Sequence, residues 1–265
     1  MILSIGHLTI DTIIFPSGES QEDILGGSAV YAAAGARVWT EDVGIIARKG
    51  IDYPEEKLNV LKMHGIQLFL QEVRHRSLKG KMTYDESGER EGAPLPDSGS
   101  GEDLAVLPKE IPPMLLGAGH SFHIASIPTS SQIRLVNFLS GKEDFILDPH
   151  PDLSKKQEKF FSMLEQVQIF FPSLKHAKLA LNLEDPYEAV FKFSQKGPNM
   201  VVQRIGEAGS LLFDKNSNSL YKIPIFNTNV ADPTGAGDAY CGGFIANYRV
   251  SQDPLLACCY ATDSA

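Results

Sequence analysis

Residues 232–244 of the chain read DPTGAGDAYCGGF, a Gly-Ala-Gly turn placed directly before a segment of helical spacing. A glycine-rich turn that opens a helix leaves backbone N–H groups without intrahelical partners, and the helix dipole adds partial positive charge, so such a turn binds a phosphate. Asp238 follows the turn, where a carboxylate is suited to accept a proton from a hydroxyl that attacks phosphorus. The local chemistry therefore indicates phosphoryl transfer to an alcohol, with Asp238 as base and with γ-phosphoryl charge stabilised by the N–H groups of Gly235, Ala236 and Gly237. The alternative is a plain strand-to-helix turn in which Asp238 is only an acid favoured by the dipole.

Outside this stretch, short runs rich in Ile, Val and Phe alternate with longer segments of helical spacing. This alternation is typical of an α/β fold with a mostly parallel sheet covered by helices. We expect strands at residues 2–5, 9–15, 43–47, 67–70, 121–124, 144–147, 168–171, 200–204, 210–213 and 223–226. We expect helices at residues 28–39, 55–64, 130–139, 155–166, 186–195, 236–248 and 254–265. Residues 72–92 break the alternation because they are polar, and we interpret them as a hairpin, turning at 85–88, that stands off the main sheet.

The composition limits the classes of function. The 265 residues include 33 acidic and 24 basic side chains, and the net charge of −9 argues against non-specific binding of nucleic acid. No apolar run approaches the roughly 20 residues needed to span a bilayer. The three cysteines form no CxxC pair, which is typical of a reducing compartment. We therefore expect a cytoplasmic protein with no nucleic-acid or membrane partner, folded as a single domain over residues 1–265.

Three other motifs were weighed against this interpretation. Residues 141–143 read GKE, so the Ser or Thr of a P-loop is missing. Gly6 opens no G-x-G-x-x-G, which disfavours a dinucleotide site. His120 and His123 lie three apart, which in a strand places them on opposite faces, and no cysteine or carboxylate cluster accompanies them. We interpret these two as core or edge histidines rather than metal ligands.

Taken whole, residues 232–244 resemble the C-terminal signature of the PfkB family of carbohydrate kinases, which have the ribokinase-like fold. The resemblance implies a three-layer α/β fold, with a mostly parallel central sheet, helices on both faces and a small β lid. The predicted hairpin at residues 72–92 falls where the family carries that lid, and lid closure would exclude water from the transferring phosphate. The resemblance further implies ATP and Mg²⁺ as cofactors.

The resemblance extends to other site residues along most of the chain. Asp11 in GHLTIDTI and the paired glycines Gly26 and Gly27 match the positions that hold the acceptor in this family. Residues 204–209, RIGEAG, resemble the turn that contacts the nucleotide phosphates, which implies nucleotide binding by Arg204, Gly206 and Gly209. Asp232 matches a position that helps to bind a monovalent cation in some members. An aspartate that caps the coming helix is the alternative for Asp232.

Two departures from the family pattern bear on catalysis. The family's Asn-x-x-Glu motif, which arranges magnesium, water and phosphate, is replaced here by Ser173 and His176. A neutral imidazole is a poor ligand for Mg²⁺, so we expect either that another carboxylate such as Glu207 or Asp232 compensates or that phosphoryl transfer is slow. The chain also ends at Ala265, within the helix-like segment 254–265 and short of the family's usual extent, and we expect a C-terminal truncation.

These observations predict an ATP-dependent kinase that phosphorylates a hydroxyl of a sugar, a nucleoside or a similar small alcohol. Residues 28–31, SAVY, and Thr9 in place of the family's Asn predict an acceptor pocket more apolar than a ribose site. Such a pocket suits a nucleoside, an inositol or a modified sugar. The alternative is a non-catalytic binding or regulatory protein that keeps the kinase fold. The exposed edge of the lid hairpin also allows pairing across a homodimer.

Overall fold

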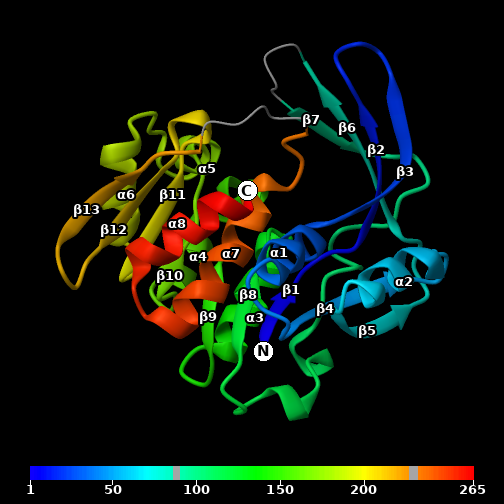
Figure 1. Ribbon diagram of the computed structural model, residues 1–265, viewed down its shortest axis with the longest axis horizontal. Helices are drawn as coiled ribbons and strands as arrows, with labels where there is room; N and C mark the ends of the chain where they lie inside the picture. The colour runs from blue at the N-terminus through cyan, green and yellow to red at the C-terminus, as the bar shows by residue number, and fades with distance from the viewer. Residues whose placement is uncertain (86–89, 227–231) are drawn as a thin grey trace.

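The computed structural model describes residues 1–85, 90–226 and 232–265, and its centre is one large sheet (Figure 1). Within those residues the sheet has nine strands in the order β13-β12-β11-β10-β9-β8-β1-β4-β5. Neighbouring strands from β5 to β11 are parallel, while β12 and β13 are added antiparallel. The bounds are β1 (Ile2–Ile5), β4 (Val43–Gly50), β5 (Gln67–Val73), β8 (Ser121–Ile124), β9 (Asp144–Leu147), β10 (Ile169–Phe170), β11 (Met200–Arg204), β12 (Ser210–Asp214) and β13 (Ser219–Ile223).

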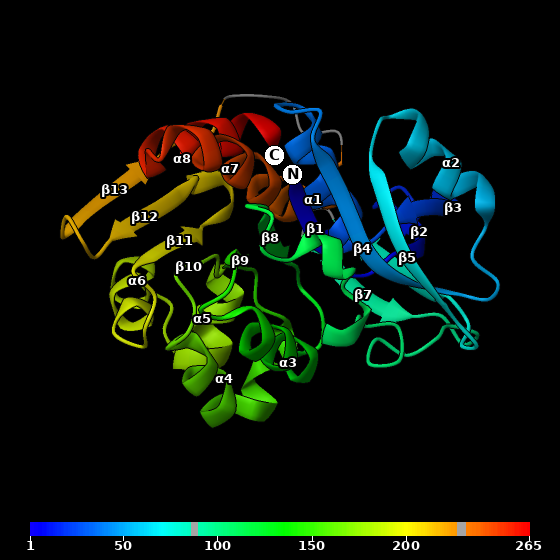
Figure 2. The same cartoon turned by 90° about the horizontal axis from the view of Figure 1, so that it is seen from below.

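Helices cover both faces of this sheet and make three layers (Figure 2). One face carries α1 (Ser28–Arg37), α7 (Ala236–Ser251) and α8 (Pro254–Ser264), and α2 (Glu55–Met63) adds buried leucines to the same core. The other face carries α3 (Thr129–Leu139), α4 (Gln157–Leu164), α5 (Leu174–Leu181) and α6 (Pro186–Ser194). Short 3₁₀ helices lie at Pro108–Glu110, Pro113–Leu115, Pro151–Lys156 and Gly206–Ala208. Buried apolar side chains fill the space between each helix layer and the sheet, as this layered architecture requires.

The helices α1 and α7 pack with their backbones in contact. A Cβ at Gly35 of α1 would lie 2.7 Å from the Cα of Ala239, and a Cβ at Gly242 of α7 would lie 2.8 Å from the nitrogen of Ala36. Real Cβ atoms do not approach so closely, so the absence of a side chain at both glycines permits this crossing. Tyr31, in the first turn of α1, packs against Gly235, the N-cap of α7, so the two helices begin side by side.

A second sheet stands off the central one and forms the lid (Figure 1). Among the described residues it has four strands in the order β3 (Ser20–Gly26), β2 (Thr9–Ile14), β6 (Leu78–Tyr84) and β7 (Arg90–Pro94). The lid is larger than the hairpin expected at residues 72–92, because β2 pairs in parallel with β6 and brings β3 with it. Residues 72–73 extend β5 instead. The turn expected at 85–88 falls largely outside the described residues, and pairing of lid edges in a homodimer stays a prediction.

Three elements were not expected from the sequence. β3 exposes most of its side chains, so it lacks the apolar run that marks a core strand. α5 has only eight residues, too few for a clear helical period. The strand expected at 223–226 is displaced, because β13 already ends at Ile223.

In the part of the chain that the structure describes, the helices are all too short or too polar to traverse a lipid bilayer.

Candidate active site

The carboxyl ends of the parallel strands meet at one edge of the central sheet. After β1 the chain adds β4 and β5 on one side of it and later adds β8 on the other side. The strand order therefore reverses at β1. Ligands of open α/β sheets bind outside the strand ends at such a reversal. The lid strand β2 follows the end of β1 directly and covers this edge. The topology therefore places the candidate site between the sheet edge and the lid.

Residues 233–237, which we call the glycine turn, form the start of α7. Gly235 is the N-cap with a φ of 78°, a left-handed conformation that favours glycine, and the helix begins at Ala236. The N–H of Ala236 donates to the carbonyl of Pro233 at 3.2 Å. This N–H, one of three expected to bind phosphate, is thus used inside the turn. Asp238 follows in the first helical turn, where it is half-buried.

Tyr31 lies near two groups of predicted site residues, the glycine turn and the acceptor-binding Asp11. It lies in the first turn of α1, and its ring packs over Gly235, where a Cβ would overlap the ring atoms. Burial raises the pKa of the Tyr31 hydroxyl, and three nearby carboxylates raise it further, those of Asp11, Asp232 and Asp238. Carboxylates from both ends of the chain therefore act electrostatically on one neutral hydroxyl.

The Asp11 carboxylate occupies a space that glycines leave open. Asp11 is 3% exposed in β2, and its Oδ2 accepts a hydrogen bond from Thr9 Oγ1 at 2.8 Å. A Cβ at Gly26 would overlap Oδ2, and a Cβ at Gly80 would lie 2.7 Å from Oδ1. Gly27, which follows Gly26, is the N-cap of α1. The structure thus brings together the three residues expected to hold the acceptor, and Thr9 supports the carboxylate.

The lid contacts the glycine turn directly. Tyr84, near the end of β6 and 7% exposed, places its hydroxyl against Thr234 Oγ1. The N–H of Thr234 in turn donates to Asp232 Oδ1 at 2.8 Å. This bond closes a turn ahead of the helix, and the N-cap of α7 is Gly235 with no side-chain cap, so Asp232 does not cap α7. The cation role of Asp232 stays a prediction. The lid therefore contacts the same turn against which Tyr31 packs.

The two glycines expected to approach the nucleotide lie together after β11. Gly209 donates its N–H to the carbonyl of Gly206 at 2.9 Å, and both glycines have positive φ. Arg204, directly before this turn, points the other way. Its guanidinium enters the interior and binds the Asp148 carboxylate and two backbone carbonyls. The structure therefore separates Arg204 from the glycines with which the resemblance grouped it.

Ser173 and His176 form the first turn of α5 at the same sheet edge. The N–H of Ser173 donates to His176 Nδ1 at 3.1 Å, and the N–H of His176 donates to Ser173 Oγ at 3.4 Å. Burial, together with the nearby Arg204 cation, lowers the pKa of His176 to about 3. The imidazole is therefore neutral, and the pair serves as a reciprocal helix cap. It supplies no carboxylate to a magnesium ion.

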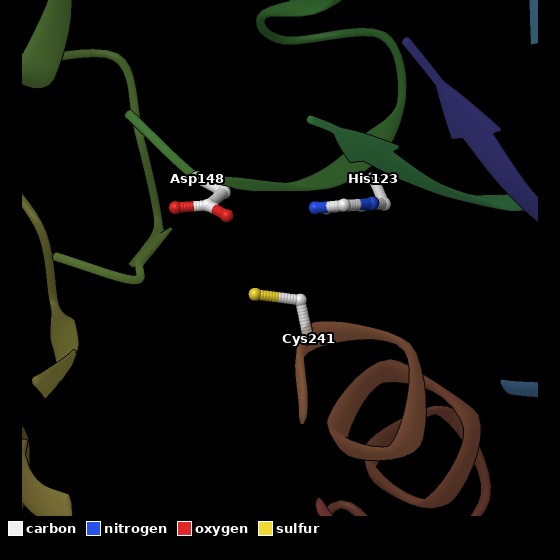
Figure 3. Close-up of side chains that lie close together, drawn as sticks. All are labelled: His123, Asp148 and Cys241. Atoms are coloured by element: carbon white, nitrogen blue, oxygen red, sulfur yellow. The ribbon is translucent and has the colours of Figure 1, made fainter. Parts of the chain in front are cut away.

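Three buried side chains meet beneath the start of α7: His123, Asp148 and Cys241 (Figure 3). Their potential ligand atoms lie within 4.8 Å of one another. This corrects the expectation that no cysteine or carboxylate accompanies His123, because strands and a helix distant in sequence converge here. Asp148 already binds Arg204, with Nη2 2.5 Å from Oδ1, and a fixed cation at that distance repels a second one. We therefore interpret the trio as interior packing rather than a metal site.

Sequence reasoning missed Tyr31, Tyr84 and Asp148 as candidate functional residues. Tyr31 lies one helical turn after Gly27, so its place at the N-terminal end of α1 was a usable signal. Asp148 directly follows the buried strand β9, at the strand ends where functional side chains gather. Tyr84 has no such local signal, because its contact depends on how the lid packs against the glycine turn.

Comparisons with known proteins agree with this geometry. Residues 1–265 match the model of the pfkB family carbohydrate kinases. The chain is 33% identical over 264 residues to the cytidine kinase of Thermococcus kodakarensis, covering 97% of this chain and 91% of the relative. It is 27% identical over 284 residues to the ATP-dependent ribose-1-phosphate kinase of Halopiger xanaduensis, covering 98% and 88%. The solved adenosine kinase from Sinorhizobium meliloti superposes with a TM-score of 0.81 at 16% identity, covering 99% of this chain and 91% of that one.

The chain belongs to the pfkB family of carbohydrate kinases. The predicted family and the predicted ribokinase-like α/β fold are both confirmed. The protein is accordingly a kinase, and the alternative of a non-catalytic protein that keeps the kinase fold finds no support in these comparisons.

Proposed function

We propose that the protein transfers the γ-phosphoryl group of ATP to a hydroxyl of a nucleoside. The observation that carries this proposal is the packing of Tyr31, in the first turn of α1, against Gly235 at the start of α7, where the carboxylates of Asp11 and Asp238 both act electrostatically on the Tyr31 hydroxyl. An acceptor-binding carboxylate and a candidate base thus lie on two sides of one site beneath the lid. The likeness to a cytidine kinase over nearly the whole chain supports a nucleoside as the acceptor.

Charge favours a neutral acceptor over a sugar phosphate. The largest electrostatic influences on the Tyr31 hydroxyl come from the carboxylates of Asp11, Asp232 and Asp238, followed by the hydroxyl of Tyr84. A phosphorylated acceptor such as ribose 1-phosphate would place two negative charges beside these carboxylates, and like charges in a site of low dielectric repel strongly. A nucleoside carries no charge on its sugar or base. It therefore fits this site better than the acceptor of the ribose-1-phosphate kinase.

The geometry supports in-line transfer with a carboxylate base. Asp238 accepts the proton of the acceptor hydroxyl while that oxygen bonds to the γ-phosphorus and the bond to the β,γ-bridging oxygen breaks, which releases ADP. The N–H groups of Gly235 and Gly237, together with the dipole of α7, stabilise charge on the γ-phosphoryl oxygens. Asp11 orients the acceptor, and the lid excludes water from the reacting atoms.

The residues present fit a magnesium ion that arrives with the nucleotide. Among the described residues, the only group of three potential ligands whose donor atoms lie within 4.8 Å of one another is the buried trio beneath α7, so the described carboxylates near the glycine turn form no closed cage. Mg²⁺ is commonly held by one or two carboxylates together with substrate phosphates and water. Asp232 is the exposed carboxylate beside the turn and is the residue proposed to face the ion. When bound, the ion would neutralise negative charge on the nucleotide phosphates. Gly206 and Gly209 let the backbone approach those phosphates.

Thermal unfolding with MgATP and a panel of acceptors tests the proposal. A ligand at 100 times its Kd stabilises the native state by about 2.7 kcal/mol, and a chain of this size shifts by roughly 2 to 4 °C per kcal/mol. We expect a rise with MgATP that grows with cytidine or adenosine, followed by ADP release with the same nucleoside. A rise with ribose 1-phosphate and none with nucleosides would contradict the neutral acceptor. No rise with MgATP would contradict ATP as the donor.

The acceptor contact is tested separately by replacing Gly26 with alanine. The new methyl group would displace the Asp11 carboxylate, and a hydrogen bond to a charged group contributes about 1.5 to 3 kcal/mol, or roughly a 10- to 100-fold rise in the KM for the nucleoside. Steady-state kinetics with the nucleoside varied at saturating MgATP measure this change. Gly18→Ala, in the turn of the same hairpin, is the control: its φ of 84° adds backbone strain, but its Cβ meets no atom within 4 Å, so it is expected to lower stability without changing the KM. Equal KM values in the two variants would remove Asp11 from the acceptor site.

A further inference from the structure

A buried ion pair lies behind the glycine turn, between Arg204 at the end of β11 and Asp148 directly after β9. Arg204 Nη2 lies 2.5 Å from Asp148 Oδ1, and Nη1 lies 3.3 Å from Oδ2. The guanidinium also donates to the carbonyl of Gly237 at 2.6 Å and to the carbonyl of Phe171 at 2.9 Å. The side chains of Arg204 and Asp148 are only 15% and 4% exposed. One cation thus ties the ends of β9, β10 and β11 to the first turn of α7.

The contacts of Arg204 use the hydrogens with which an arginine grips a phosphate. Each terminal nitrogen carries two hydrogens. Nη1 donates to Asp148 and to the Gly237 carbonyl, and Nη2 donates to Asp148 and to the Phe171 carbonyl. Burial opposes the charge of the guanidinium, but the Asp148 carboxylate more than offsets this and raises the pKa of Arg204 above its ordinary value. Arg204 is therefore a fixed cation: the protein binds both of its terminal nitrogens, and its Nε is buried without a hydrogen-bond partner among the described residues.

Stability alone does not account for this arrangement. Removing two charges from water offsets most of their attraction, so a buried ion pair is a weak source of stability. A cation beside the first turn of a helix is also repelled by the positive end of the dipole. His123 adds no charge to the region, because burial lowers its pKa to about 3. What the pair does supply is geometry: a two-bond fork holds its partners in one orientation.

We propose that Arg204 and Asp148 position the glycine turn for phosphoryl transfer and that neither residue touches the nucleotide. The Gly237 carbonyl belongs to the same planar peptide group as the N–H of Asp238. By holding that carbonyl, Arg204 sets the position of the base and the direction of the N–H groups that face the phosphate. This inference rests on the proposed function, because it assigns the turn to phosphoryl transfer.

The substitution Asp148→Asn tests the inference, because it keeps the side-chain volume and breaks the charged fork. A small misplacement of reacting groups lowers the rate by up to about 10²-fold, so we expect kcat to fall roughly 10- to 100-fold. The Kd of ATP is expected to change little. Amides of residues 235–238 are expected to exchange hydrogen faster. If Arg204 instead bound the nucleotide, Arg204→Lys would raise the Kd of ATP while Asp148→Asn left kcat intact, and that outcome would overturn the proposal.

A double variant separates positioning from folding. Asp148→Asn alone leaves a buried charge without its partner, which strongly lowers the unfolding temperature. Asp148→Asn combined with Arg204→Gln removes both charges, so its unfolding temperature is expected to recover toward that of the wild type while kcat stays low. Recovery of kcat together with stability would show that the pair serves folding only.

The fork between Arg48 and Glu110 is the matched control. Its Nε–Oε2 and Nη2–Oε1 distances are 2.8 and 2.7 Å, and its side chains are 12% and 14% exposed. Arg48 belongs to β4, which lies three strands away from β9, the strand that leads to Asp148. Glu110→Gln is expected to lower the unfolding temperature without changing kcat or exchange at the turn. Equal losses of kcat in Glu110→Gln and Asp148→Asn would contradict positioning. The two proposals can fail separately, because hydrogen exchange needs no substrate. A wild-type protein that transfers no phosphate would refute the proposed function. Unchanged hydrogen exchange at residues 235–238 in Asp148→Asn would refute this inference.

Discussion

Replacing Asp238 with asparagine is expected to lower kcat by about 10²- to 10⁴-fold, the range that a positioned base contributes. An amide has the same shape as the carboxylate but cannot accept the proton of the attacking hydroxyl. An acid in the first turn of a helix gains only about 0.3 to 1 kcal/mol from the dipole, so the unfolding temperature is expected to change by a few degrees at most. Coupled measurement of ADP release, together with a thermal melt, checks both expectations.

The same substitution at the start of the next helix is the control for Asp238→Asn. Asp253 caps α8, and its Oδ1 accepts hydrogen bonds from the N–H groups of Leu255 and Leu256 at 2.9 and 3.0 Å. Asparagine caps helices about as well as aspartate. Asp253→Asn is therefore expected to retain both kcat and stability. If Asp238→Asn also retained kcat, the proton would leave by another route and Asp238 would not be the base.

Replacing Gly235 with alanine is expected to damage stability and turnover together. Alanine at a φ of 78° costs about 1 to 2 kcal/mol, and a methyl group forced against the Tyr31 ring adds about 1 to 3 kcal/mol of overpacking. At roughly 2 to 4 °C per kcal/mol, the unfolding temperature is expected to fall by about 4 to 20 °C. Below that temperature kcat is expected to fall about 10²-fold, because the shifted turn misplaces both the phosphate donors and Asp238.

Gly141 distinguishes the backbone effect from the contact with Tyr31. Its φ is 71°, close to that of Gly235, but a Cβ there meets no atom within 4 Å. Gly141→Ala is therefore expected to lose only the 1 to 2 kcal/mol of backbone strain, roughly, and to retain kcat. Should Gly235→Ala behave like Gly141→Ala in both melts and kinetics, the packing of Tyr31 against the glycine turn would have no part in the site.

Most of the central sheet was predictable because its strands are buried on both faces. β1, β8, β9 and β11 have the bounds expected from the sequence, since a strand covered by two helix layers reads as a continuous apolar run. The lid was only partly predictable. Its hairpin β6–β7 has a turn signal, but β3 is mostly exposed and carries no period that marks a strand. The extent of the lid follows from the pairing of β2 with β6, which no local pattern specifies.

The candidate site, like the fold, was only partly predictable from the sequence. Gly26 and Gly27, and the run from Gly235 to Asp238, were assigned from short motifs because their backbone requirements are local. Arg204 was assigned from its neighbours in sequence, yet its side chain turns toward Asp148, 56 positions earlier in the chain. The direction of a side chain depends on which partner the packing supplies, and that partner is not encoded nearby.

By itself the sequence determined the family, the parallel α/β core and the glycine turn at the start of α7, because these depend on periodicity and on backbone freedom within short segments. Only the tertiary structure decided that Asp11 and Asp238 gather around Tyr31 and that Arg204 lies behind the turn. These contacts arise because α1 packs closely against α7 and because the strand order brings the ends of β9, β10 and β11 together. Such long-range packing is a property of the whole fold rather than of any one segment.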